Sequence, residues 1–422
     1  MEVTNMVEVE QSVPYLAIAD SNSSHKFAYS PPYNNETKSA DDGSRTFNGP
    51  RTILTLISTA TASLGQILPI NAPYNHSTYS VRFFGPVVRC DMANSSAAAR
   101  MDNLLQAKMA TSPGIAKETV NVYYAFVPAF NTTGELIALS KPRLQSPSNA
   151  TNQLWMTFLR YAIDPGGNRI KERRYQVCQL YNASYDLKLE WDRGFQNATG
   201  SYGVLEEVRF PNDKSDVVSD LPQHSYSAFM WALTDLLVGA FSWFVESNQS
   251  QFGAIDTTVP RTSLLGSSDL DVFFDLNKNN EDSDETQLSD QRLQDKALAK
   301  NRTLGVLIEE LSFNMTVSLM HNELLNHNTT AKVTRWDSVN RYGYNPYGLF
   351  IPYALANLFT LITVLLGIVS YSHNGVLPDK KFQDIVSAAE DPRIIHVARD
   401  RRKSMTAERV EGRLVLRPGM DR

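Results

Sequence analysis

An uncharged, apolar stretch at residues 349–371 places the strongest constraint on how this chain can fold. It reads LFIPYALANLFTLITVLLGIVSY and contains no Asp, Glu, Lys, Arg or His, while thirteen of its side chains are Leu, Ile, Phe or Val. A helix of this length would measure about 35 Å, which exceeds the roughly 30 Å of a bilayer's hydrocarbon core. Tyr342, Tyr344, Tyr347 and Tyr353 crowd its N-terminal edge, as is typical of a membrane interface. We therefore expect a transmembrane helix, with a buried core helix as the alternative.

Sequons of the form Asn-x-Ser/Thr are concentrated on one side of this stretch. Twelve of the 28 asparagines before residue 349 begin a sequon, and no sequon follows residue 371. Chance would give about four or five, and glycans are added in the secretory lumen. Residues 1–348 should therefore be luminal or extracellular, and residues 372–422 cytoplasmic. The predicted glycosylation sites are Asn22, Asn35, Asn75, Asn94, Asn131, Asn149, Asn182, Asn197, Asn248, Asn301, Asn314 and Asn328.

The charge distribution is compatible with this orientation. Residues 1–371 carry 29 Lys and Arg against 37 Asp and Glu, whereas residues 372–422 carry 11 against 8. A short basic segment after the apolar stretch fits a cytoplasmic tail, although its basic excess begins only at Arg393. A nucleic-acid-binding domain would show a basic stripe, so we expect the lipid bilayer as a partner and no nucleic acid.

The two cysteines, Cys90 and Cys178, both precede the apolar stretch. Two cysteines cannot build a disulfide-stapled scaffold, but in an oxidising lumen they can form one bridge. Closing a loop of about 89 residues would stabilise the fold by about 4–5 kcal/mol in the chain-entropy model. We predict this bridge, with two separate buried thiols as the alternative.

Residues 1–50 have few apolar clusters and many Ser, Asn, Asp and Pro residues, which predicts a disordered N-terminal segment. The segment also shows neither the basic n-region nor the apolar h-region of a signal peptide. A luminal domain needs a signal that starts translocation. We therefore expect that a signal anchor or further N-terminal spans are missing from this chain.

Residues 51–348 predict a folded luminal domain of the α+β class. Runs rich in β-branched and aromatic residues predict strands at residues 78–84, 120–127, 153–161, 175–180 and 184–191. The segment DPGGNR at residues 164–169 predicts a hairpin loop. Helical patterns follow at residues 227–244 and 304–325. This order favours a β-sandwich-like domain with packed helices, followed by the single transmembrane helix.

Two segments of this domain are apolar enough to be weighed as further spans. Residues 52–70 are rich in Ser and Thr, which favours a strand followed by a turn. Residues 227–244 contain Asp235, which would cost about 2.5–3.5 kcal/mol at the membrane centre. Sequons on both sides, at Asn197 and Asn248, also argue against a span there. We expect a packed amphipathic helix in which Asp235 is the best candidate for a carboxyl group with a shifted pKa.

Several segments share a pattern with a known family. They are residues 68–79 (LPINAPYNHSTY), residues 84–86 with Cys90, residues 178–185 (CQLYNASY), residues 308–319 (IEELSFNMTVSL), and the apolar stretch running into Asn374 and Gly375. With these segments the chain resembles a family of filamentous-fungal membrane glycoproteins of unknown function. The resemblance, over roughly residues 50–390, implies an integral membrane protein of the plasma membrane or secretory pathway. Members are often labelled formylmethionine deformylase-like, but the His-Glu-x-x-His metal motif is absent from this sequence.

An incomplete calcium motif lies at residues 275–286, DLNKNNEDSDET. Asp275, Asn277 and Asn279 have the 1, 3, 5 spacing of an EF-hand loop. However, the sixth position is not Gly, and Thr286 stands at the twelfth position where a Glu is required. A solvated acidic loop is the alternative.

The sequence offers no catalytic or cofactor-binding motif, since a nucleophile elbow, a P-loop and a dinucleotide fingerprint are all absent. The carboxylate pairs Glu206-Glu207 and Glu309-Glu310 are interpreted as surface groups, because one sequence cannot show two carboxylates facing one cleft. In the tail, the segment Arg401-Arg-Lys-Ser404 has the form of a basophilic kinase site with Ser404 as the acceptor. The same basic cluster suits contact with anionic lipid.

These features favour an integral membrane glycoprotein with an interaction or structural role, no cofactor, and a protein or glycan partner for its luminal domain. One alternative is a membrane-tethered hydrolase acting on glycans, which a cleft lined by convergent carboxylates would favour. The other is a subunit of a membrane complex, in which Asn357, Thr360 and Thr363 would bond to a partner helix.

Overall fold

The chain divides into two compact units. One comprises residues 4–338, which we call the folded domain, and the other comprises residues 339–422 together with residues 1–3. The computed structural model describes residues 2–20, 23–29, 47–110, 118–142, 149–211, 221–246, 249–255, 257–275, 293–340, 346–374, 405–410 and 413–418.

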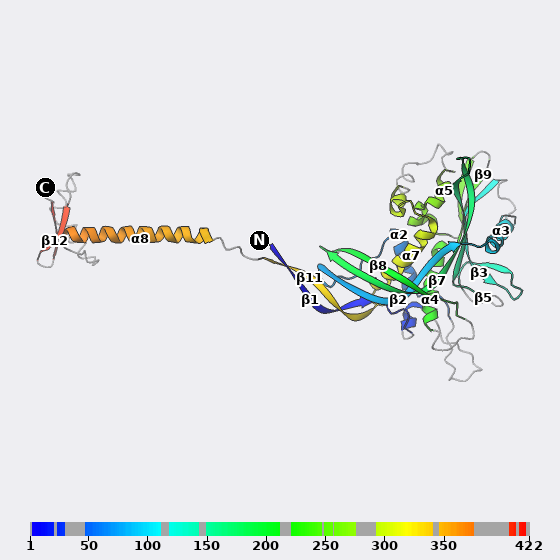
Figure 1. The fold of residues 1–422 in the computed structure, drawn as a ribbon, viewed down its shortest axis with the longest axis horizontal. Coiled ribbons are helices and arrows are strands. Elements are labelled where there is room, and N and C mark those ends of the chain that lie inside the picture. Colours follow the sequence, from blue (N-terminus) through cyan, green and yellow to red (C-terminus); the bar gives the residue numbers. More distant parts are fainter. Residues whose placement is uncertain are drawn as a thin grey trace, which may run out of the picture. The chain divides into compact units, whose positions relative to one another are not determined.

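The folded domain is built on one large β-sheet, in which the central strand pairs run antiparallel (Figure 1). Among the described residues the sheet has eleven strands in the order β1-β11-β2-β7-β6-β3-β9-β10, with β4 and β5 paired to β3 and β8 paired to β7. The strands are β1 Glu2–Tyr15, β2 His76–Met92, β3 Glu118–Phe130, β4 Leu136–Leu139, β5 Asn149–Ala150, β6 Gln153–Ile163, β7 Arg169–Asp192, β8 Phe195–Glu207, β9 Gly239–Glu246, β10 Gln249–Ile255 and β11 His327–Asn340.

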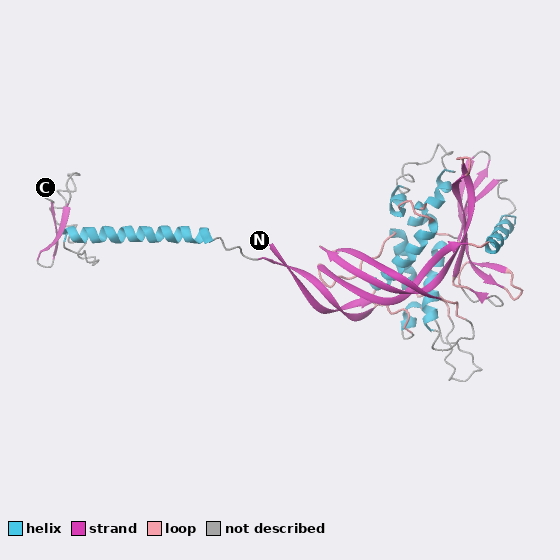
Figure 2. Cartoon of the chain, viewed as in Figure 1, coloured by secondary structure: helices cyan, strands magenta, loops and turns pink. Residues whose placement is uncertain are grey.

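Helices cover the sheet (Figure 2). The labelled helices of the folded domain are α1 Ser24–Phe27, α2 Thr52–Leu64, α3 Ser95–Ala110, α4 Leu221–Leu237, α5 Asp271–Asp275 and α7 Leu304–Ser318, with 3-10 turns at Val259–Arg261, Ser263–Gly266, Ser268–Leu270 and Leu319–His321. Residues 293–299 are also helical. The main core lies between the sheet and the helices α2, α4 and α7. A smaller core lies under α3, against β3 and β6. The α+β class is confirmed, but helices rather than a second sheet cover this sheet, so the expected sandwich is not what forms.

Strand β7 joins the parts of the sheet because it is long enough to serve two neighbours on one side. It pairs with β2 from His76–Asp192 to Met92–Gln176 on one edge. On its other edge it pairs first with β6 and then with β8. The sequence predicted two strands here, at residues 175–180 and 184–191. The structure forms one continuous strand, with the predicted hairpin loop at residues 164–169 before it.

Helix α7 takes the place of a strand along part of the free edge of β2, because β11 pairs only with the start of that edge. Side chains of α7 bond to alternate backbone groups of β2. The bonds run from the Val88 N–H to Ser312 Oγ (3.0 Å), from the Cys90 N–H to the Glu309 carboxylate (2.8 Å), and from Thr316 Oγ1 to the Pro86 carbonyl (2.7 Å). Buried backbone groups need such partners, so α7 and β2 are held in one register.

Residues 52–64 form helix α2, so the predicted strand at this position was wrong. The buried residues have helical spacing: Leu54, Ile57, Ser58, Thr61 and Ala62. Their hydroxyl groups are satisfied inside the helix, because Ser58 Oγ donates to the Leu54 carbonyl and Thr61 Oγ1 to the Ile57 carbonyl. Gly65 ends the helix in the left-handed conformation (φ 65°), which explains the turn signal at this residue.

The two predicted helices in the second half both end seven residues earlier than expected, and α4 also begins six residues earlier, at Leu221. The segment predicted at residues 227–244 is helical only as α4, which ends at Leu237. Gly239 then adopts a φ of 121°, and the chain continues as β9 between β3 and β10. A conformation with positive φ is available mainly to glycine, so this residue allows the change from helix to strand. Likewise α7 ends at Ser318 and is followed by a 3-10 turn.

Much of the N-terminal segment is ordered, in contrast to the predicted disorder of residues 1–50. Strand β1 pairs with β11, and α1 packs against α4. Leu16, Ile18 and Phe27 are almost completely buried in the main core. The segment has few apolar residues, but these few insert between elements from the far end of the sequence, which composition cannot reveal. Residues 30–46, the most polar part, lie outside the described residues.

The second unit contains helix α8, Pro346–Asn374, and a two-stranded hairpin of β12, Met405–Val410, and β13, Arg413–Pro418. Residues 346–373 are all exposed. Within the described residues, α8 is the helix that is long and apolar enough to cross a membrane. It starts three residues before the predicted span and ends three residues after it.

The predicted disulfide is confirmed, because Cys90 on β2 and Cys178 on β7 are directly opposite each other and bonded. We expect replacing both cysteines by Ala to lower the free energy of unfolding by about 4–5 kcal/mol, since the bridge closes a long loop in the unfolded chain. Urea unfolding of the oxidised protein and of the variant measures this difference. The wild-type protein under reducing conditions is the control and should match the variant. Equal stability in all three samples would contradict the prediction.

Candidate functional site

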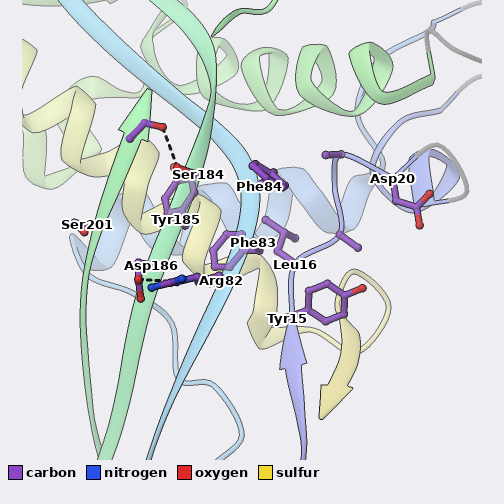
Figure 3. Close-up of a pocket in the computed structure, with 13 residues that line it drawn as sticks. Tyr15, Leu16, Asp20, Arg82, Phe83, Phe84, Ser184, Tyr185, Asp186 and Ser201 are labelled. Atoms are coloured by element: carbon purple, nitrogen blue, oxygen red, sulfur yellow. Dashed lines mark hydrogen bonds and ion pairs between the residues drawn. The ribbon is translucent and has the colours of Figure 1, made fainter. Parts of the chain in front are cut away.

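A pocket of about 770 Å³ lies between the chain after β1 and the strands β2, β7 and β8, and we call it the sheet pocket (Figure 3). Its lining residues are Tyr15, Leu16, Ala17, Ala19, Asp20, Arg82, Phe83, Phe84, Ser184, Tyr185, Asp186, Ser201 and Gly203. Aromatic rings therefore stand beside charged groups and hydroxyls. The contributing segments are distant in the sequence, and none of them was predicted as a site.

Strand register explains why the polar lining residues meet. Arg82, Asp186 and Ser201 occupy one row across β2, β7 and β8, because Asp186 is directly opposite both of the others. Phe84 and Ser184 occupy the next position on the same side of the sheet. Residues directly opposite each other in antiparallel strands share a face, so these side chains gather beside the pocket.

An ion pair between Arg82 and Asp186 is the main charged feature of the sheet pocket. Arg82 Nε lies 2.9 Å from Asp186 Oδ2, and the two side chains are 85% and 50% exposed. A pair this exposed contributes at most about 1 kcal/mol to stability, so its groups remain available to a ligand. Phe84, on the same strand, leaves 53% of its surface exposed. An open ring next to paired charges suits a ligand with both an apolar face and hydrogen-bonding groups.

The back of the sheet pocket is rigid. The rings of Phe83 and Tyr185 are stacked with centroids 4.9 Å apart, and Tyr185 stacks in turn on Phe313 of α7. Tyr185 donates a hydrogen bond to the Pro86 carbonyl at 2.6 Å. Burial raises the pKa of this phenol far above its ordinary value, so it stays neutral. These contacts hold the wall in place.

Asp235 lies on α4, as predicted, and its environment shifts its ionisation. Burial raises the pKa of its carboxyl group, and Lys141 partly opposes this effect. Lys141 Nζ lies 3.3 Å from Asp235 Oδ1 and 5.7 Å from the centre of the Trp231 ring. The predicted shift in the pKa of the Asp235 carboxyl group is confirmed. However, Asp235 is an ion-paired residue of α4 and does not line the sheet pocket.

The carboxylates of the two glutamate pairs do not meet in one cleft. Glu309 accepts a hydrogen bond from Cys90 and lies 3.5 Å from Arg89 Nε. Glu310 forms an ion pair with Arg302. Glu206 accepts a hydrogen bond from Asn182 at 3.4 Å. Each of these groups has a structural partner, which agrees with their interpretation as surface or supporting groups.

A second charged cluster is formed by side chains from separate elements, so the sequence does not predict it. Arg160 of β6 lies 3.6 Å from Glu172 of β7 and 3.5 Å from Asp269. The Asp269 carboxylate also accepts the Leu304 N–H at 2.8 Å, at the start of α7. The positive end of a helix favours a carboxylate at this position. The cluster therefore fixes α7 on the sheet, and no local sequence pattern could reveal it.

The predicted glycosylation sites are in different environments. The asparagines whose side chains are exposed are Asn75, Asn94, Asn197, Asn301 and Asn328. Asn131 is half-buried, with its carbonyl oxygen bonded to Thr133 of its own sequon at 2.6 Å. Asn149 lies in β5, with its backbone alone described, and Asn22, Asn35 and Asn248 lie outside the described residues.

Two sequons are engaged in the core packing. Asn314 is only 9% exposed inside α7, and Thr316 of the same sequon donates to a carbonyl of β2. Asn182 is half-buried in β7, where its side-chain oxygen accepts a hydrogen bond from Tyr226 at 2.7 Å. Burial argues against a glycan on Asn314 in the folded domain. The exposed asparagines remain predicted sites.

The remaining predicted sites lie mostly outside the described residues. Asp275 ends α5, while Asn277, Asn279 and the phosphorylation candidate Ser404 lie outside the described residues. In the described part of the chain, no group of three or more His, Cys, Asp or Glu side chains could hold a metal ion. Thr360 and Thr363 of α8 donate to carbonyls of their own helix, at 2.8 and 2.5 Å.

Comparison with known proteins returned no matching family model, no matching curated protein and no matching solved structure. The function is therefore argued from the geometry of this chain.

The raised pKa of Asp235 predicts a specific pH dependence of stability. A carboxyl group with a higher pKa in the folded state binds more protons there than in the unfolded chain, so stability falls as pH rises from about 4 through the folded pKa. Replacing Asp235 with Asn removes this loss. We expect the variant to gain stability relative to the wild type across this window, and urea unfolding between pH 3 and 7 measures the gain.

Lys141→Met provides the control, because removing the opposing charge should steepen the pH dependence of the Asp235 protein and leave the Asp235→Asn protein unchanged. If the free energy of unfolding of the wild type and of Asp235→Asn changes with pH in parallel, the prediction is contradicted.

Proposed function

We propose that this chain is a membrane-anchored glycoprotein, and that its folded domain is an interaction module held at a luminal or extracellular membrane surface. Helix α8 is the observation that carries the proposal. It is long enough to cross a bilayer, and its apolar residues 346–373 are all exposed. A core helix of a soluble protein would be covered by its own chain, so the exposure favours lipid as the surroundings of α8.

The folded domain supports the proposed orientation. Its bridge between Cys90 and Cys178 suits an oxidising compartment, where disulfides persist. Five predicted glycan acceptors are exposed on it. The basic residues gather after α8, as expected for a tail on the cytoplasmic side. Together with the resemblance noted in the sequence, these features favour a place at the fungal cell surface or in the secretory pathway.

The sheet pocket supports a binding role more than a hydrolytic one. Its lining contains two carboxylates, Asp20 and Asp186, and the second is already paired with Arg82. Glycoside hydrolysis needs one protonated and one ionised carboxyl group facing the same bond. The exposed Phe84 ring next to the ion pair offers stacking and hydrogen bonding instead, which fits a protein or glycan partner.

Expression of the chain behind a cleavable signal peptide in a fungal host tests the proposal. We expect the protein to stay in the membrane after carbonate extraction, to shift in size on deglycosylation, and to lose a C-terminal epitope when the cytoplasmic side is exposed to protease. Deleting residues 346–374 should release the folded domain into the medium, because only the apolar helix retains it.

A matched pair of variants sharpens this test. Asn328→Gln should remove one glycan, since Asn328 is exposed, whereas Asn314→Gln should leave the glycan number unchanged, since Asn314 is buried. A full-length protein that carbonate releases would overturn the anchor, and a protein without glycans would overturn the orientation.

A further inference from the structure

Strand β8 begins with an exposed aromatic ring at the edge of the sheet. Phe195 is 81% exposed, the largest value for an aromatic side chain in the described part of the chain. Among the described strands β8 pairs only with β7, so its other edge has no strand partner. An unpaired edge that also carries an apolar side chain is a surface that associates with other chains unless something covers it.

The next residues along β8 form a sequon in register with this ring. Phe195, Asn197 and Thr199 alternate along the strand, so all three side chains lie on one face of the sheet. Their partners on β7 are Asp192, Glu190 and Lys188, which lie on the same face. Successive residues on one face are about 7 Å apart. The first sugar linked to Asn197 therefore lies within reach of the Phe195 ring.

Contacts on the opposite face lock this register. The side chain of Gln196, between Phe195 and Asn197, accepts the Ile70 N–H at 2.5 Å and donates to the Leu68 carbonyl at 3.3 Å. Ala198 packs against the main core. A slip of β8 by one residue would bury Phe195 and Asn197 and break both bonds of Gln196, so the outward orientation is fixed.

We propose that Phe195 is the stacking platform for the first N-acetylglucosamine of an N-glycan on Asn197, and that this glycan covers the open start of β8. The proposal rests on the luminal orientation proposed above. One face of a pyranose ring presents C–H groups, and packing them on an aromatic ring removes apolar surface of both from water. The sugar's hydroxyls and amide stay in solvent.

Asn197 is distinguished from the other exposed sequons by this ring. Among the described sequons, it is the one with an aromatic residue two positions before the asparagine. Asn75 follows Tyr74 directly, and the Tyr74 ring lies under Arg335, with 4.9 Å between the guanidinium and the ring centre. Asn94 is exposed without an aromatic side chain at either preceding position, and Asn328 is exposed with only the His327 ring directly before it. They serve as matched controls.

A double-mutant cycle on the glycosylated full-length protein tests the proposal. The variants are Phe195→Ser, Asn197→Gln and both together. We expect Asn197→Gln to lower Tm by about 2 °C when Phe195 is present and to have almost no effect when residue 195 is Ser, because the glycan stabilises through the ring. Trimming the glycan to its first sugar should keep the effect, and complete enzymatic removal should abolish it.

The control variant and each alternative outcome of this experiment give different results. Asn94→Gln should act independently of Phe195, and static light scattering should show more self-association for Asn197→Gln than for Asn94→Gln. If Asn197 carries a glycan and the Tm effects of Phe195→Ser and Asn197→Gln are additive, the proposal is overturned. Mass spectrometry showing glycans at other sites but none on Asn197 would overturn it while leaving the orientation intact, whereas a protein with no glycans at all would overturn both. If the Tm effects of the two substitutions stay coupled after the glycan is removed, a protein partner rather than the sugar contacts Phe195, and the proposal is overturned.

Discussion

The fold depends on satisfying the backbone of β2 along both of its edges. One edge is paired with β7 for the whole length of the strand. The other edge has β11 only at its start, and farther along it is completed by Glu309, Ser312 and Thr316 of α7. A buried N–H or carbonyl group without a partner costs about 1–3 kcal/mol, so this substitution of a helix for a strand decides where α7 lies. The main core follows from it, because α2 packs against α7 and α4 packs against α2 and the sheet.

The same arrangement explains why the exposed features of the domain gather on β8. Strand β7 has room for two neighbours on its far edge, and β6 and β8 share it end to end. β8 is thereby left at an edge, where its residues can face solvent. Ser201 lines the sheet pocket, and Asn197 lies about 13 Å away along the same strand face. A glycan on Asn197 would thus stand next to the pocket and limit the size of partner that can approach it.

The sequence predicted what depends on local pattern and missed what depends on distant contacts. Runs rich in β-branched and aromatic residues located the strands around Tyr79, Tyr123 and Phe158, and a long uncharged run located α8. By contrast, the Ser- and Thr-rich sequence of α2 predicts a strand, although its hydroxyl groups bond within a helix and its buried residues have helical spacing. The sheet pocket joins Arg82 to Asp186 across a separation of 104 residues, and no pattern within one segment encodes that contact.

The sequons of this chain do not all indicate glycosylation, because residues of some of them have structural roles. Thr316 is explained by its bond to Pro86, and Asn182 by its bond with Tyr226, so these two sequons would be retained for packing even in a protein that is never glycosylated. Some of the exposed asparagines also have structural roles. Asn301 adopts a positive φ of 56°, a conformation that asparagine tolerates better than most residues. At Asn94 the side chain caps the start of α3 by accepting the Ala97 N–H, a role that Ser or Asp would fill equally well. Asn197 faces solvent on β8, and the bond between Gln196 and Ile70 fixes the register of this strand. Any polar residue at position 197 would therefore satisfy the fold. The sequons that bear on the proposed luminal orientation are therefore those whose asparagine is exposed and whose side chain the fold does not require.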